Sequence, residues 1–320
     1  MCCDEPCRII VTTFPFGDPD PKPLDQLEGF DVTYNEVGRK YSPEEHHAVL
    51  KVRNPHIIIA GTEKYTAEVL DLCPALRMIS RVGIGVDSVD LDECEKRGII
   101  VCNTPDAPSN AVAELTVCQM INALRRVSIV DSIIRNDGWE RFIGRELRDC
   151  DVGIIGFGRI GTLVAQKMWG LKPRRVFIND IVQEKCKDIQ RCEYATKSQI
   201  MYHCDIITLH IPYNSENHHF ISEDDLRLMK DGVVLINTSR GGIVDENALY
   251  NWLKRKPNAT AAVDTFVKEP YKDLLIELPN CLLTPHLGSC TRKSRFGMEV
   301  GATEEAMNFL RGKPFNSRIR

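Results

Sequence analysis

The chain repeats one local pattern almost from end to end: a short apolar, β-branched run followed by a longer stretch of helical spacing. The first apolar runs lie at 7–13, 55–61, 76–83 and 98–103. Strands that are apolar at every position must be buried on both faces, which is typical of parallel sheets covered by helices. The predicted fold class is therefore α/β, with doubly wound parallel sheets.

A second series of the same kind follows a stretch from Asn110 to about Arg135, whose apolar spacing predicts one long helix. Its apolar runs lie at 151–156, 174–180, 204–212, 232–241, 259–266 and 281–288. A last helix is expected from Thr291 to about Arg311. Because 320 residues are too many for one comfortable core, the two series predict two domains.

Composition excludes several classes of protein. A formal net charge of −4 argues against a nucleic-acid surface, which needs a concentrated basic patch. No run approaches the ~20 apolar residues that span a bilayer, and the first residues lack the apolar core of a secretory signal. We therefore expect a cytoplasmic protein that binds neither nucleic acid nor membrane.

The 13 cysteines do not have the pattern of a disulfide scaffold. Their number is odd, and those in IIVCNTP and ELTVCQM lie inside apolar segments, where free thiols are expected to be buried in a reducing compartment. Cys2, Cys3 and Cys7 are followed by no second cysteine or histidine pair at zinc-finger spacing. We expect a frayed N-terminal tail there and no metal.

The stretch DVGIIGFGRIG carries three glycines between an apolar run and a helical stretch. In a dinucleotide-binding turn, Gly156 would make the tight turn, Gly158 would let the backbone approach a pyrophosphate, and Gly161 would permit close helix–strand packing. The amides of Arg159 and Ile160 would then face the phosphates. A plain tight turn is the alternative interpretation.

Asp180 ends the next apolar run, at the distance where such domains carry an acid for the adenosine ribose. A carboxylate there accepts hydrogen bonds from the ribose hydroxyls and repels a 2′-phosphate. The cofactor predicted is therefore NAD rather than NADP, with an unrelated aspartate as the alternative.

Polar residues follow the last three apolar runs: Arg240, then Asp264 and Glu269, then His286. An arginine fork can hold a carboxylate together with a neighbouring oxygen atom. A histidine of ordinary pKa ~6.5 suits proton transfer to that oxygen, and Glu269, if hydrogen-bonded to His286, would fix its ring. Taken singly, each has a structural alternative: a surface ion pair for the arginine, a loop acid for the glutamate and a structural histidine.

The other histidines lack such a context. They include His46, His47, His218 and His219, all of which we expect at the surface.

These segments resemble the D-isomer-specific 2-hydroxyacid dehydrogenase family, most closely its phosphoglycerate dehydrogenase-like branch. The resemblance runs from about Lys51 to Thr291 and rests on motifs in the family's order, among them GIGVDSVD, GIIVCNTP, AVAEL, GIIGFGRIG, HIPYNSENHHFI, LINTSRGGIVDE, VDTFVKEP and TPHLGS. It implies an NAD-dependent oxidoreductase that transfers a hydride between nicotinamide and a D-2-hydroxy or 2-oxo acid. It also implies a homodimer, and a Rossmann domain at 105–289 inserted in a flavodoxin-like substrate domain formed by 1–104 and 290–320.

The resemblance further implies the role of single residues. Arg240, Glu269 and His286 would be catalytic, with Arg240 and His286 also touching substrate and cofactor. Asp264 would bind the nicotinamide carboxamide. The backbone amides of Val82, Gly83, Ile84 and Gly85 would bind the substrate carboxylate. The remaining cofactor contacts would come from His210, Ile211, Pro212, Thr238, Ser239 and Gly288.

The chain departs from the phosphoglycerate dehydrogenase-like branch in three places. Ala60 and Gly61 stand where that branch carries an arginine for the substrate phosphate, and Lys64 is only a point charge. Asp106 and Pro108 stand where asparagines are usual, and from the length we expect no regulatory serine-binding domain. A general D-2-hydroxy acid is therefore the expected substrate.

Two other functions fit the same scaffold. The corepressors called C-terminal binding proteins resemble these enzymes and would make the chain an NAD(H)-sensing protein-interaction module; the lack of long tails disfavours this alternative. A formate dehydrogenase-like reaction is disfavoured because that branch has glutamine in the place of Glu269.

Overall fold

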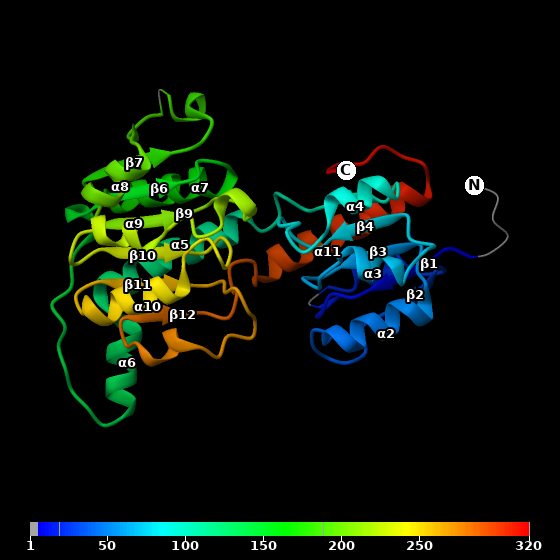
Figure 1. The fold of residues 1–320 in the computed structure, drawn as a ribbon, viewed down its shortest axis with the longest axis horizontal. Helices are drawn as coiled ribbons and strands as arrows, with labels where there is room; N and C mark the ends of the chain where they lie inside the picture. The colour runs from blue at the N-terminus through cyan, green and yellow to red at the C-terminus, as the bar shows by residue number, and fades with distance from the viewer. Residues whose placement is uncertain (1–5, 19, 188, 320) are drawn as a thin grey trace. The chain divides into compact units, whose positions relative to one another are not determined.

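The structure is a computed structural model that describes residues 6–18, 20–187 and 189–319. The chain divides into two compact units, which we call unit 1 (Met1–Pro108 with Thr291–Arg320) and unit 2 (Ser109–Cys290). Figure 1 labels most of their helices and strands. Each unit is built on one parallel sheet, so the predicted α/β class is confirmed. Which unit holds the substrate and which the cofactor stays a prediction.

Unit 1 contains a five-stranded parallel sheet in the order β2-β1-β3-β4-β5. The strands are β1 (Arg8–Val11), β2 (Asp31–Thr33), β3 (Ile57–Ala60), β4 (Met78–Arg81) and β5 (Ile100–Cys102). The helices are α1 (Lys22–Asp25), α2 (Pro43–Arg53), α3 (Ala67–Asp71), α4 (Leu91–Lys96) and α11 (Arg292–Leu310). Apolar residues of α2, α3 and α4 pack on one face of the sheet and those of α11 on the other. This strand order is that of flavodoxin-like folds.

Unit 2 contains a seven-stranded parallel sheet in the order β12-β11-β10-β9-β6-β7-β8. The strands are β6 (Asp151–Ile155), β7 (Arg175–Asn179), β8 (Glu193–Tyr194), β9 (Ile206–Leu209), β10 (Val234–Asn237), β11 (Thr260–Val263) and β12 (Cys281–Leu283). The chain runs outward from β6 to β8 and then returns to β9, so the order reverses between β6 and β9. Open α/β sheets bind ligands at such a reversal, outside the carboxyl ends of the strands.

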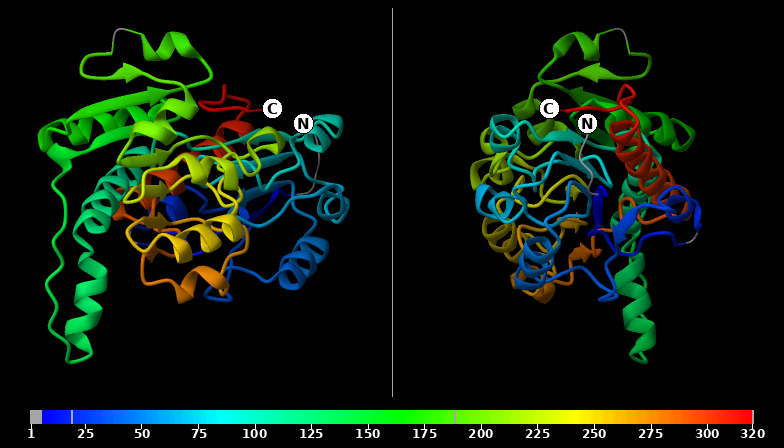
Figure 2. Two further views of the ribbon diagram at one scale, coloured as in Figure 1. Left: turned by 60° about the vertical axis from the view of Figure 1, so that its left-hand side comes forward. Right: turned by 90° about the vertical axis from the view of Figure 1, so that its right-hand side faces the viewer.

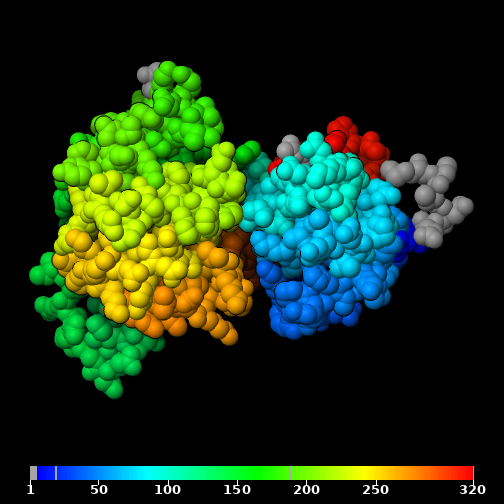
Figure 3. All heavy atoms as spheres, viewed as in Figure 1, coloured from blue at the N-terminus to red at the C-terminus, as the bar shows by residue number. Residues whose placement is uncertain are grey.

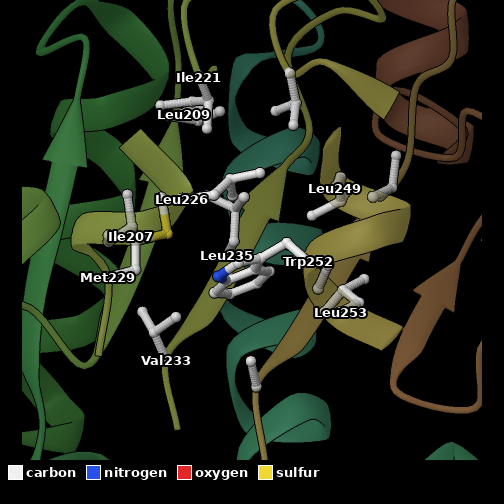
Figure 4. Packing of buried hydrophobic residues seen from close by; sticks show 14 of the residues in the cluster. Ile207, Leu209, Ile221, Leu226, Met229, Val233, Leu235, Leu249, Trp252 and Leu253 are labelled. Atoms are coloured by element: carbon white, nitrogen blue, oxygen red, sulfur yellow. The ribbon is translucent and has the colours of Figure 1, made fainter. Parts of the chain in front are cut away.

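Helices cover both faces of this second sheet. They are α5 (Ser109–Arg125) and α7 (Arg159–Met168) on one face, and α8 (Lys197–His203), α9 (Glu223–Leu228) and α10 (Glu246–Arg255) on the other. Figure 4 shows the hydrophobic core between this sheet and α8, α9 and α10, where Trp252 of α10 lies among Leu235, Leu249 and Leu253. Two of these helices begin with the reciprocal bonds of a capping box, at Thr196 and at Ser222.

The single long helix predicted from Asn110 to Arg135 is wrong. The helix breaks at Arg126, whose φ of +51° is left-handed, into α5 and α6 (Val127–Arg135). Helix α5 buries one side against the sheet, whereas none of the nine residues of α6 is buried. Figure 2 shows α6 projecting from unit 2 and the following residues running back beside it as an extended segment. We call residues 126–146 the arm; it forms the green protrusion of unit 2 in Figure 3.

Three smaller expectations are also corrected. His46 is buried rather than exposed, with its ring edge-on to Tyr65 at 5.1 Å, and burial lowers its pKa to about 4. Cys118 is exposed, although Cys102 is buried as predicted. Cys7 is half-buried and packs against the core of unit 1, so the frayed tail does not include it; Cys2 and Cys3 lie outside the described residues. No described helix is both long and apolar enough to cross a membrane.

Candidate active site

The glycine turn after β6 is shaped by close contacts with the neighbouring backbone. Gly156 has a φ of +91°, and a Cβ there would lie 2.3 Å from the carbonyl oxygen of His210. A Cβ on Gly161 would lie 2.1 Å from the carbonyl oxygen of Gly156. Real side chains do not approach that closely, so the packing of unit 2 itself requires glycine at both positions.

At Gly158, in contrast, packing against the described residues does not require glycine. A Cβ there would meet no atom within 4 Å, and Gly158 begins α7 without a side-chain cap on the helix amides. The amides of Arg159 and Ile160 therefore lie at a helix start beside the open space at Gly158. Helix starts of this kind bind anions, so the turn fits the pyrophosphate of a dinucleotide.

Asp180, at the end of β7, is tied to the same turn. One carboxylate oxygen accepts from the amide of Phe157 at 2.9 Å, and the other accepts from the amide of Val182, also at 2.9 Å. An ionised carboxylate can accept more than one hydrogen bond at each oxygen, so acceptor capacity remains for ribose hydroxyls.

His210 follows β9 and is held in a neutral form. Its Nε2 pairs with the hydroxyl of Thr208 at 3.0 Å, while burial lowers its pKa to about 3. Its Nδ1 is buried and has no hydrogen-bond partner among the described residues. His210 therefore cannot serve as a proton donor near neutral pH. Ile211 beside it is half-buried, and Pro212 is exposed.

The turn after β10 is organised by Asn237, which the sequence analysis missed. Its amide oxygen accepts from the amide and hydroxyl of Ser239, and its amide nitrogen donates to the carbonyl of Arg240 at 2.9 Å. The hydroxyl of Thr238 pairs with that of Thr116 on α5 at 2.9 Å. The turn therefore presents the half-buried Arg240 side chain from a fixed backbone.

The turns after β10 and β11 touch backbone to backbone. A Cβ on Gly241 would lie 2.0 Å from the carbonyl carbon of Phe266. The amide of Phe266 in turn donates to a carboxylate oxygen of Glu269 at 3.2 Å. The arginine and the glutamate are thus carried by two interlocked turns.

Asp264, at the end of β11, holds the turn that follows β12. Asp264 is fully buried. One carboxylate oxygen accepts from the Thr284 hydroxyl at 2.5 Å and from the Leu287 amide at 2.8 Å. The other oxygen accepts from the Gly288 amide at 2.9 Å. Its carbonyl also accepts from the amide of His286. Burial raises the pKa of Asp264. Its contact to nicotinamide stays a prediction.

His286 and Glu269 form a pair. The His286 Nδ1 lies 3.1 and 3.0 Å from the two oxygens of Glu269, and both side chains are about one-third exposed, at 33% and 32%. A carboxylate only accepts hydrogen bonds, so Nδ1 carries a proton and Nε2 is the ring atom left to gain or lose one. His286 has a φ of +55°, a backbone conformation that is uncommon for residues other than glycine. The contacts of Asp264 hold the backbone in this conformation.

In unit 1, the turn Val82–Gly85 points its carbonyls toward the protein. The carbonyls of Val82, Gly83 and Ile84 accept from Arg81, Thr104 and Asn103, respectively. The Val82 amide donates to Ala60 and the Gly83 amide to the Thr104 hydroxyl. Among the described residues only the amides of Ile84 and Gly85 in this turn have no acceptor. Of the four amides predicted to bind a carboxylate, those of Ile84 and Gly85 therefore remain as candidates.

Sequence reasoning missed the residues that hold these turns, namely Asn103, Thr104, Asn237 and Thr284. Each lies at the end of a strand, one or a few residues from a predicted site residue or directly across from one on the next strand. Short polar side chains at strand ends bond to nearby backbone, and that is the signal that could have found them.

Comparison with known proteins gives the family. A model of the D-isomer-specific 2-hydroxyacid dehydrogenase NAD-binding domain matches residues 117–288. The chain is 34% identical over 274 residues to a glyoxylate reductase of Thermococcus litoralis, covering 82% of this chain and 83% of that protein. It is 32% identical over 267 residues to a D-3-phosphoglycerate dehydrogenase of Archaeoglobus fulgidus, covering 82% of this chain and 51% of that protein. The chain belongs to the D-isomer-specific 2-hydroxyacid dehydrogenase family.

Structure agrees with that assignment. A D-lactate dehydrogenase of Aquifex aeolicus, solved with NAD and lactic acid, has a TM-score of 0.81 at 28% identity and covers 95% of this chain and 96% of its own. The chain is therefore an NAD-dependent oxidoreductase of 2-hydroxy and 2-oxo acids, as predicted. The open space at Gly158 and the acid at Asp180 are the features that fit this cofactor.

Proposed function

We propose that this dehydrogenase reduces a small, unphosphorylated 2-oxo acid, such as glyoxylate or hydroxypyruvate, to the D-2-hydroxy acid. The observation that carries the proposal is the His286–Glu269 pair on the turn held by Asp264. Relatives named glyoxylate reductase support the substrate class, as does the lack of an arginine at Ala60 and Gly61. Relatives named D-3-phosphoglycerate dehydrogenase make a phosphorylated substrate the competing outcome.

The proposed roles follow from the donors and acceptors on each turn. Arg240 holds the substrate carboxylate and the adjacent oxygen with its planar fork. His286 delivers the proton from Nε2 to that oxygen, and removes it in the oxidative direction. Glu269 fixes the ring through Nδ1. In unit 1, taken by itself, the amides of Ile84 and Gly85 can donate to a carboxylate.

The cofactor site is proposed from the same edge of unit 2. The amides of Arg159 and Ile160 would hold the pyrophosphate, and Asp180 the adenosine ribose. Segments at His210–Pro212 and Thr238–Ser239, together with Asp264 and Gly288, would line the rest. When bound, NADH supplies the hydride.

The arm is the proposed contact between two copies of the chain. Its exposed apolar residues include Val127, Ile134, Trp139 and Ile143, the last at 94% exposure. A nine-residue helix is marginal in water unless something packs on it. Sedimentation equilibrium should give a dimer for the wild type and a monomer for Ile134→Asp/Ile143→Asp. Val52→Asp, an exposed position of α2, is the control, and a monomeric wild type would contradict the proposal.

We also propose the cytoplasm as its compartment, because the described cysteines form no disulfide with one another.

The function is tested by NADH oxidation with a panel of 2-oxo acids: glyoxylate, hydroxypyruvate, pyruvate, 3-phosphohydroxypyruvate and branched or aromatic acids. We expect the highest kcat/KM for glyoxylate or hydroxypyruvate. A preference for 3-phosphohydroxypyruvate would move the chain to the phosphoglycerate dehydrogenase branch. Tight NADH binding without turnover on any acid would contradict the proposal and favour the nucleotide-sensing alternative.

A further inference from the structure

A carboxylate fills the space beyond the carboxyl end of β3 in unit 1. Glu63 is only 5% exposed, and a Cβ on Gly61 would lie 2.6 Å from its Oε2. A buried acid is uncommon unless it is paired or has a function. Glu63 makes no ion pair with any described cation, so its place at a ligand-binding edge calls for a physical reason.

The bonds around Glu63 have a definite direction. Thr12 Oγ1 donates to Oε2 of Glu63 at 3.1 Å, and it lies 2.9 Å from the hydroxyl of Tyr65. Because the Thr12 hydroxyl has one proton and gives it to the carboxylate, Tyr65 must be the donor to Thr12. The amide of Gly61 donates to the same Thr12 oxygen at 3.2 Å. This chain of donors ends on Oε2 of Glu63, which acts as the acceptor.

The second oxygen of Glu63 is different. Oε1 has no hydrogen-bond partner among the described residues, yet it is not one of the buried polar atoms that lack a partner. Oε1 is therefore not completely enclosed, and it is an acceptor with unused capacity.

Glu63 lies on the same edge of the sheet as the two free amides. Strands β3 and β4 are neighbours, with Ala60 opposite Arg81, and the amide of Val82 donates to the carbonyl of Ala60. The Arg81 guanidinium lies beneath the turn, so that a Cβ on Gly83 would be 3.0 Å from it. Unit 1 thus presents two donors for a carboxylate, at Ile84 and Gly85, and one acceptor oxygen at the end of the adjacent strand.

We propose that Glu63 is a specificity-determining residue, whose Oε1 accepts a hydrogen bond from a hydroxyl on the substrate and whose charge excludes a phosphate at that position. The inference rests on the proposed function and narrows its substrate class to hydroxylated 2-oxo acids such as hydroxypyruvate. A hydroxyl can donate to Oε1, whereas a phosphate at neutral pH carries about −1.5 to −2 charges and would face a like charge.

The test compares kcat/KM for hydroxypyruvate, glyoxylate and 3-phosphohydroxypyruvate in the wild type and in Glu63→Gln. Glyoxylate has no hydroxyl to donate and serves as the reference substrate. In Glu63→Gln, we expect the hydroxypyruvate-to-glyoxylate ratio to fall roughly tenfold or more, since hydrogen bonds to charged groups are the strong ones. The 3-phosphohydroxypyruvate-to-hydroxypyruvate ratio should rise by roughly tenfold.

Glu68→Gln is the matched control, because it removes the same charge from an exposed position on the first turn of α3. Its ratios should equal those of the wild type. Unchanged ratios in Glu63→Gln, or equal losses on all three substrates, would overturn the inference while leaving the proposed function intact.

A second measurement needs no variant. The wild type should reduce 3-methoxypyruvate, which lacks the hydroxyl proton, roughly tenfold or more less efficiently than hydroxypyruvate. Equal efficiency would overturn the inference. A wild type that reduces none of these acids would instead contradict the proposed function and the inference together.

Discussion

The carboxyl-end edges of the two sheets are built in opposite ways. In unit 2, side chains face outward from interlocked turns: the Glu269–His286 pair follows β11 and β12, while the backbone is held by Asn237 and Asp264. In unit 1, polar side chains such as Glu63 and Tyr65 are buried, and two backbone amides, at Ile84 and Gly85, have no acceptor among the described residues. Proton transfer needs a titratable side chain, whereas a carboxylate can be bound by amides alone. We infer that the chemistry resides on unit 2 and part of the substrate selection on unit 1.

The largest effect should come from the outward-facing histidine of unit 2. We expect His286→Asn to lower kcat by roughly 10²–10⁴, the usual share of a general acid or base, because the variant lacks the ring that Glu269 holds through Nδ1. NADH affinity, measured by fluorescence titration, should stay near the wild-type value. His47→Asn, at an exposed position, is the control. Unchanged turnover in His286→Asn would remove that residue from the mechanism.

The glycine turn separates packing from ligand binding within one edge. Gly161→Ala would drive a Cβ into the Gly156 carbonyl and should cost roughly 1–3 kcal/mol of unfolding free energy. Gly158→Ala places its Cβ in open space, so it should cost less than about 1 kcal/mol of stability. It should nonetheless weaken NADH binding about tenfold, because the backbone can no longer approach the pyrophosphate. Equal stability losses in urea titrations of the two variants would contradict this division.

His46 tests the inward-facing character of unit 1. Burial lowers its pKa from 6.5 to about 4, so the folded chain binds fewer protons than the unfolded chain between these values. The contribution of His46 to the free energy of unfolding should therefore rise with pH across that window, by at most roughly 3 kcal/mol. Above the window this contribution should be constant.

His46→Phe keeps an aromatic ring against Tyr65 and removes the titration. In urea titrations, the free energy of unfolding should fall less between pH 7 and pH 4.5 in this variant than in the wild type. A part of the fall should remain because the pKa of His210 in unit 2 is also lowered. If the free energy of unfolding falls as much at pH 4.5 as in the wild type, His46 is not the cause of the pH dependence.

Asp180 should affect the choice of cofactor rather than turnover or stability. Asp180→Ala removes the acceptor for the ribose and the repulsion of a 2′-phosphate, so the NAD-to-NADP ratio of kcat/KM should fall by roughly tenfold. The variant also loses the bonds to Phe157 and Val182, so both cofactors should bind somewhat less tightly. A ratio that stays at the wild-type value would count against the ribose assignment.

The same contrast explains what could be predicted from the sequence. The outward residues of unit 2 follow apolar runs within recognisable motifs, so Arg240, Glu269 and His286 could be singled out in advance. The edge strands β2 and β8 were missed because they are three and two residues long and are not fully buried. The break at Arg126 was missed because apolar spacing continues through it, although nothing in the described chain buries α6.

The inward residues of unit 1 gave no such signal. Glu63 in the stretch GTEKYT looks like an ordinary surface acid, and His46 beside His47 looks like a surface histidine. Glu63 is bonded to Thr12, and His46 packs against Tyr65; each partner lies in another part of the sequence. Local pattern does not encode contacts of this kind.

The division between the two edges is tested most directly by one ratio measured in two variants. The quantity is kcat/KM for hydroxypyruvate divided by kcat/KM for glyoxylate. His286→Asn should lower both values by a similar factor and leave the ratio within about threefold of the wild type, whereas Glu63→Gln should change the ratio. A ratio that moves in His286→Asn and stays constant in Glu63→Gln would contradict the account.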